Sequence, residues 1–205
     1  MKSRFIKQSL CALVAVSGLA GALTVHAKEQ GDWLVRFGGS YISPKSNNHE
    51  LVSVDGKMGV TFNFSYFMTS NLAVEVLAAL PYEHDIELQG GTKVASTKHL
   101  PPTVSLQYHF MPEAGIQPYV GLGVNYTTFF SEKTVGPLAG SDLDLDDSWG
   151  WAGQAGLDIP LNEKWLLNID VRYIDIDTKA KLDGTSIGTV AIDPWVYGAN
   201  VGFKF

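Results

Sequence analysis

The most regular feature of the sequence is an alternation of apolar residues with polar or small ones, which returns in eight separate segments. In the last segment the apolar positions include Trp195, Tyr197 and Phe205, whereas Asn200 and Lys204 occupy the opposite positions. Because successive side chains of a strand point to opposite faces, each segment predicts a β-strand with one apolar face. The eight segments cover residues 33–41, 58–66, 72–80, 100–110, 118–126, 149–159, 165–173 and 195–205.

The connections between these segments alternate in length. Residues 68–71, 111–117 and 160–164 form short turns, whereas residues 43–57, 89–99, 131–148 and 178–191 form long polar connections. Strands of this length, with aromatic residues at both ends of the apolar face, are typical of outer-membrane barrels. The pattern predicts an all-β fold, an eight-stranded antiparallel transmembrane β-barrel with short periplasmic turns and long extracellular loops.

A soluble, lipocalin-like barrel is the alternative fold. It would turn its apolar face inward and fill the interior with large side chains. Here the face opposite the apolar one carries Glu75, Asn125 and Asp170, while the apolar face has aromatic residues at its rims. This distribution favours the membrane barrel, with the polar face inside.

Residues 1–27 have the features of a secretory signal peptide, which leaves 28–205 as the barrel domain. A basic start is followed by an apolar stretch from Leu10 to Leu23 and by the small-residue site Val25-His26-Ala27. The apolar stretch is shorter than the roughly 20 residues that a membrane-anchor helix needs. The full chain has a net charge of −6, and removing this segment takes away basic residues only. Such an acidic protein is not expected to bind nucleic acid.

Several motifs go beyond architecture, and they occur in a specific order. They are His99-Leu100-Pro101-Pro102-Thr103 before Gln107-Tyr108-His109-Phe110, Pro118 to Thr127, Asp147-Ser148-Trp149-Gly150, and Asp170 to Asp177. With them, essentially the whole mature chain resembles the OmpW/AlkL family of outer-membrane proteins. The resemblance implies a bacterial outer-membrane barrel that admits small hydrophobic molecules. Likeness to other outer-membrane barrels implies that assembly machinery recognises the strand ending at Phe205.

The inward-facing residues near the short turns are mostly charged or amide side chains. Because an unpaired buried charge is costly, we expect them to pair and to close the periplasmic half of the narrow lumen as a polar plug. The predicted plug consists of Arg36, Glu75, Gln107, His109, Asn168, Asp170 and Lys204, with Asp158 at the same level.

Toward the long loops the inward residues become apolar or small, which predicts a hydrophobic pocket open to the outside. Leu77 and Arg172 should form its floor, where the two regions meet. The predicted pocket and floor residues are Leu77, Ala79, Phe129, Ala152, Arg172, Ile174 and Val196. The alternative is that these residues merely fill a barrel that is narrow at eight strands.

Prolines stand at the outer ends of two neighbouring segments. Pro81 ends the third, and Pro101 and Pro102 begin the fourth. Proline donates no ladder hydrogen bond, so this part of the wall could have a lateral gap. We therefore expect hydrophobic solutes to leave the pocket sideways into the outer-membrane lipid. The alternative is that the prolines only end strands at the rim.

Other chemistry finds less support in the sequence. The acidic run at Asp142, Asp144 and Asp146 lacks the glycine and distal glutamate of a calcium loop. A lipid-modifying enzyme would need a triad such as Ser148 with Asp147 and a rim histidine, and no spacing supports it. We expect no enzymatic activity, cofactor or metal. The main alternative function is a non-conducting surface barrel whose loops serve as a receptor or adhesion site.

Overall fold

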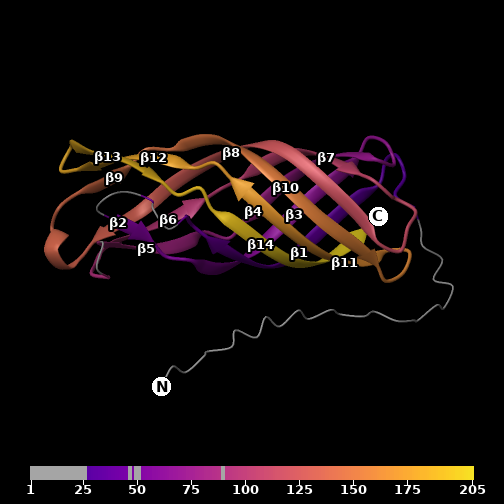
Figure 1. Cartoon of the computed structure of the whole chain (residues 1–205), viewed down its shortest axis with the longest axis horizontal. Helices are drawn as coiled ribbons and strands as arrows, with labels where there is room; N and C mark the ends of the chain where they lie inside the picture. The colour runs from indigo at the N-terminus through magenta and orange to yellow at the C-terminus, as the bar shows by residue number, and fades with distance from the viewer. Residues whose placement is uncertain (1–26, 46–47, 49–51, 89–90) are drawn as a thin grey trace, which may run out of the picture.

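Eight antiparallel strands close into a barrel in the computed structural model, which describes residues 27–45, 48, 52–88 and 91–205 (Figure 1). Each strand pairs with its neighbours, and β14 returns to pair with β1, which closes the barrel. The predicted eight-stranded fold is confirmed. The barrel strands are β1 (Trp33–Ser43), β3 (Lys57–Phe67), β4 (Leu72–Ala79), β7 (Thr103–His109), β8 (Gln117–Thr134), β10 (Ser148–Pro160), β11 (Trp165–Ile174) and β14 (Trp195–Lys204).

The long connections contain strands of their own, and they extend the molecule beyond one end of the barrel (Figure 1). β5 (Tyr82–Leu88) and β6 (Lys93–Leu100) form a hairpin that pairs with the upper part of β8 and with β2 (Val52–Val54). β12 (Asp177–Leu182), β13 (Thr185–Ala191) and β9 (Leu143–Leu145) form a separate three-stranded sheet, and η1 (Gly136–Leu138) is a short 3₁₀ turn. We call this part the extracellular extension. The alternation pattern did not predict these strands.

The outer face of the barrel is apolar, as the alternation requires of a lipid-facing surface. Leu122, Val124 and Ile169 are each more than half exposed along its middle. Aromatic contacts gather at both ends, with Trp165 against Phe203 near the short turns and Trp149 against Tyr126 on the other side. Among the described residues, no helix is long and apolar enough to cross a membrane.

Two clusters of buried apolar residues lie inside. The smaller one, near the short turns, consists of Leu34, Phe67, Ala73 and Leu166. The larger one runs from the upper barrel into the extracellular extension and includes Ile42, Tyr82, Phe129 and Ile192. The buried residues between the two clusters are mainly polar or charged. The expected signal peptide lies outside the described residues except for Ala27.

Candidate functional site

Arg36 on β1 is the centre of the polar lower lumen. Its side chain is fully buried, and its Nη2 and Nε donate to the two carboxylate oxygens of Asp158 at 2.7 and 3.1 Å. Its Nη1 donates to the Ser65 hydroxyl at 3.0 Å and lies 3.3 Å from Glu75 Oε2. Two-pronged contact with a carboxylate suits the planar guanidinium. A single arginine thus joins strands β1, β3, β4 and β10 across the lumen.

Arg172 on β11 forms the second cationic centre, above Arg36. Its Nη1 donates to Glu75 Oε1 at 2.8 Å, and its Nε donates to Asp170 at 2.8 Å. Glu75 is fully buried, and its two carboxylate oxygens bridge Arg36 and Arg172. Arg172 also reaches Asn63 Oδ1 at 2.9 Å. Removing one member would leave a buried charge without its partner.

Lys28 completes the network from the periplasmic end, and sequence reasoning missed it. Its Nζ lies 2.6 Å from Asp158 Oδ2 and 2.9 Å from His109 Nδ1, and its side chain is only 2% exposed. The His109 ring in turn contacts the Gln107 amide oxygen at 3.2 Å through Nε2. Lys28 precedes the first alternating segment, so no periodicity marked it. Its place directly after the expected cleavage site was the only available signal.

Tyr119 fills the remaining space beside Arg36. Its ring stacks on His109 with 4.9 Å between centroids, and the Arg36 guanidinium lies 5.2 Å above its face. A Cβ on Gly156 would come within 2.5 Å of this ring, so the glycine makes room for it. Lys204, in contrast, lies apart from the network, with its Nζ 3.2 Å from Asp32 at the rim.

The predicted plug residue Asn168 and the additional residue Asn200 join the network through side-chain amides. Asn168 donates to Asp158 Oδ1 at 2.8 Å and to the Tyr119 hydroxyl at 3.1 Å. Asn200 links Asn168 to Asp170 through its own amide nitrogen. We define the polar plug as this connected set, which consists of Lys28, Arg36, Glu75, Gln107, His109, Tyr119, Asp158, Asn168, Asp170, Arg172 and Asn200.

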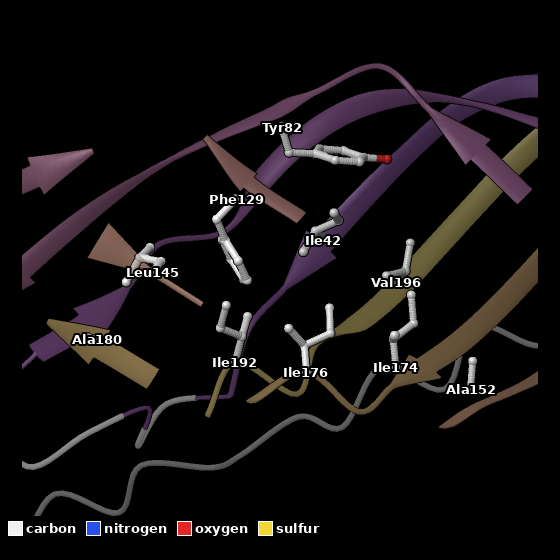
Figure 2. Packing of buried hydrophobic residues seen from close by; sticks show 10 residues of the cluster. All are labelled: Ile42, Tyr82, Phe129, Leu145, Ala152, Ile174, Ile176, Ala180, Ile192 and Val196. Atoms are coloured by element: carbon white, nitrogen blue, oxygen red, sulfur yellow. The ribbon is translucent and has the colours of Figure 1, made fainter. Parts of the chain in front are cut away.

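Apolar residues lie above the polar plug, and they form one cluster that runs from Ala152 in the barrel wall to Leu145 in the extension (Figure 2). Tyr82 belongs to this cluster and shares a 2.7 Å hydrogen bond with the Ser40 hydroxyl of β1. A Cβ on Gly59 would come within 2.1 Å of the Tyr82 ring, so this glycine allows the ring to lie against β3.

Most of the predicted pocket residues line one of two hollows. A small one at the level of Arg172, lined by Leu77, Ala152, Arg172 and Ile174, has no room for a water-sized molecule. Phe129 belongs to the apolar cluster and lines a larger hollow above it. Val196 is a member of the same cluster, and Ala79 packs against it. Each predicted residue therefore lies in this cluster, against it, or in the wall of the small hollow.

The larger hollow, which we call the extracellular cavity, lies within the extension. Its volume is about 70 Å³ when the space open to solvent is left out. Its wall is almost entirely apolar, with Ile86, Val94, Leu145 and Val190 among the lining residues. Strands β2, β5, β6, β8, β9, β12 and β13 all contribute to it. An apolar cavity of this kind suits a small hydrophobic ligand.

Two stacked histidines stand in the wall of this cavity. The rings of His84 and His99 are 4.9 Å apart, and His99 also stacks on Tyr82. Burial lowers the pKa of His84. Burial, together with the charge of a protonated His84 beside it, lowers the pKa of His99 to about 3. Both rings are therefore neutral at pH 7, which preserves the apolar character of the cavity.

The ladder of strand pairs is interrupted beside the predicted prolines. The β4–β7 ladder ends at the pair Leu77–Thr103, and the β5–β6 ladder starts at the pair Tyr82–His99. Between these two described ladders, residues 78–81 and 100–102 form no ladder pair with each other. Each side is instead held by its other neighbour, since Leu80 N donates to Val60 O and Tyr126 N donates to Pro102 O.

Comparison with known proteins shows which family has this architecture. The profile of the OmpW family matches residues 21–205. The chain belongs to the OmpW family. It is 40% identical to outer membrane protein W of Vibrio cholerae serotype O1 over 98% of this chain and 100% of that protein.

Two solved structures of relatives agree with the fold. The crystal structure of OprG from Pseudomonas aeruginosa has a TM-score of 0.77 at 36% identity, covering 89% of this chain and 99% of that one. The solid-state NMR structure of AlkL in DMPC lipid bilayers has a TM-score of 0.65 at 28% identity, covering 100% of this chain and 97% of that one. As a member of a family of outer-membrane proteins, this chain resides in the bacterial outer membrane.

Proposed function

We propose that the protein gives small hydrophobic molecules passive passage through the outer membrane. A solute enters the extracellular cavity from outside, passes along the apolar cluster, and leaves through the interrupted wall into the surrounding lipid. The family membership supports this proposal, since the resemblance to the OmpW/AlkL family implies passage of such molecules. The partners are then apolar solutes and outer-membrane lipid.

The position of the wall interruption carries the proposal. His99, directly above the interruption, lines the extracellular cavity, and Leu77, directly below it, lines the small hollow. Residues of one apolar cluster line both hollows, which supports a route past the unpaired stretch. Pro81 and Pro102 are exposed there, which supports an opening toward the surrounding lipid.

The polar plug makes a vertical route through the barrel unfavourable. A solute moving down the lumen would have to separate Arg36 from Asp158 and Arg172 from Glu75, all of them buried. Breaking a buried pair of this type costs about 3–5 kcal/mol. An apolar solute offers no compensating hydrogen bonds. The lateral route, in contrast, keeps the solute among apolar groups throughout.

Replacing the three prolines tests the lateral route. In Pro81→Ala/Pro101→Ala/Pro102→Ala the new N–H groups can extend the ladder between residues 78–81 and 100–102. We expect uptake of an alkane probe by whole cells to fall toward that of cells without the barrel. Pro118→Ala, which changes a proline near the short turns, is the control and should leave uptake unchanged. Full uptake by the triple variant would remove the support for a lateral exit.

A second candidate function is a non-conducting surface barrel whose loops serve as a receptor or adhesion site. The ordered extracellular extension favours it, since β12, β13 and β9 form a folded sheet of their own. The same uptake assay separates the two functions. Equal uptake by cells with and without the wild-type barrel would favour the surface role.

Export and assembly complete the proposal. Residues 1–27 act as the signal peptide, and the assembly machinery recognises the C-terminal strand through Phe205. Two observations support the latter: Phe205 is 62% exposed, and its N–H donates to the Trp33 carbonyl at 2.9 Å. The side chain is therefore free for recognition while the backbone closes the barrel. Phe205→Ala should reduce the amount of folded barrel in outer-membrane fractions, and an unchanged amount would contradict this role.

A further inference from the structure

One polar atom in the wall of the extracellular cavity has no partner. His84 on β5 lines the cavity, and its side chain is 1–2% exposed. Its Nε2 has no hydrogen-bond partner among the residues that the structure describes. A buried polar group of this kind calls for an explanation, since nearly all such groups are satisfied in folded proteins.

The other ring nitrogen determines what Nε2 can do. His84 Nδ1 lies 2.7 Å from the backbone carbonyl oxygen of Asp55. A carbonyl oxygen only accepts hydrogen bonds, so Nδ1 must carry the proton. In a neutral imidazole the second nitrogen then bears a lone pair and is an acceptor. Burial lowers the pKa of His84, which keeps the ring neutral at pH 7. Nε2 is therefore a fixed acceptor.

The two threonine hydroxyl groups in the cavity wall already donate hydrogen bonds to backbone carbonyl groups. Thr97 Oγ1 donates to the Lys98 carbonyl at 3.3 Å, and Thr178 Oγ1 donates to the Asp146 carbonyl at 2.6 Å. Neither can supply a proton to His84, so no hydroxyl among the described wall residues is available to Nε2. A molecule that enters the cavity can supply the missing donor.

We propose that the extracellular cavity binds aliphatic molecules that carry a hydroxyl group, and that the hydroxyl donates to His84 Nε2. This proposal rests on the proposed function and names its substrate class. The aliphatic chain packs against Ile86, Val94 and Leu145, and the hydroxyl approaches Nε2 from the cavity. A carboxylate is disfavoured in the same place, because it has no proton to donate and its charge would lose solvation.

Equilibrium binding to the full-length mature barrel in lipid vesicles tests the proposal. The probes are 1-decanol, which donates a hydrogen bond, and 2-decanone, which only accepts one, each displacing an apolar fluorophore. We expect His84→Phe to weaken decanol binding about tenfold, the value of one hydrogen bond, and to leave decanone binding unchanged. His84→Gln, whose amide can donate to Asp55 and still present an acceptor, should retain most of the decanol affinity.

The outcomes distinguish this inference from the proposed function. Suppose that both probes bind the wild-type barrel and that His84→Phe binds each of them as tightly as the wild type does. This result would overturn the role of His84 and leave the hydrophobic cavity in place. Failure of both probes to bind the wild-type barrel would overturn both the inference and the proposed function. Should His84→Phe fail to fold, the Gln variant decides, since loss of decanol selectivity in it contradicts the inference.

Discussion

The polar plug and the extracellular cavity are built from the same kind of position, the inward-facing residues of strands, and they have opposite properties. In the plug, three cations and three carboxylates pair in a lumen without room to spare, with Glu75 and Arg36 fully buried. In the cavity, apolar residues such as Val94 and Leu145 leave a volume of about 70 Å³. The difference shows that paired charges close the periplasmic half of the lumen, whereas apolar side chains leave a cavity on the extracellular side.

Removing Glu75 should have the largest effect on this contrast. Glu75→Ala leaves Arg36 and Arg172 both without a shared carboxylate, and we expect a loss of about 3–5 kcal/mol in the free energy of unfolding. Urea unfolding in lipid vesicles measures it. The same variant should admit water and ions, which single-channel conductance detects. The control is Asp144→Ala, since Asp144 is 65% exposed beside Lys181. An equal stability of the Glu75 variant and this control would show that the plug is not held by its charges.

Acid should weaken the extracellular extension. Burial lowers the pKa of His99 to about 3, whereas the unfolded segment protonates near 6.5. The unfolded state thus binds the extra proton, and stability falls as the pH drops from about 6.5 toward 3. Between pH 7.5 and pH 5 we expect a loss of about 2 kcal/mol in the extension.

Hydrogen exchange of β5 and β6 at pH 5 and pH 7.5 checks this expectation, after correction for the intrinsic pH dependence of exchange. The matched control is His99→Phe, in which the acid-induced loss of protection should shrink. If the variant and the wild type lose protection equally, the neutral histidines do not set the acid response.

Filling the cavity should have the smallest effect on stability and a visible effect on uptake. Ala180 is 2% exposed and lines the cavity. Ala180→Leu places its added atoms in empty space, so we expect the free energy of unfolding to change by less than about 1 kcal/mol. Uptake of an apolar probe should fall several-fold. Ala155→Leu adds the same atoms to the exposed outer face and should leave uptake unchanged. Equal uptake by both variants would exclude the cavity from the route.

The eight barrel strands were predictable because lipid on one side and a polar lumen on the other impose a strict period of two. The charged members of the plug were predictable for the same reason, since Arg36 and Glu75 fall on the inward face. Which carboxylate meets which arginine depends on strand register, and the sequence does not display register. The alternation does not distinguish Tyr119 from the small residues on its face, and only the room left by Gly156 explains its place.

The extension was not predictable from the alternation. Thr97 and His99 line the cavity there, and they look polar in sequence and yet are buried. The Thr97 hydroxyl is satisfied by the Lys98 carbonyl and the His99 ring by stacking, so the cavity wall forms without an apolar pattern. Lys28 was missed because a single residue before the first strand has no periodicity. The proline positions, in contrast, do indicate where the ladder is interrupted, because a missing N–H is visible in the sequence itself.

The central claim is that an apolar solute occupies the upper half of the tube and never crosses the polar plug. Photolabelling with a diazirine-bearing alkane, added from outside to cells expressing the barrel, tests it most directly when the labelled residues are mapped by mass spectrometry. Lipid-facing residues will be labelled in any case, so only inward-facing positions decide. The account predicts labels at cavity residues such as Val94 and Phe129 and at Leu77, with none at Gln107 or His109. Labels on Gln107 and His109 would contradict it, because they would place the solute inside the plug.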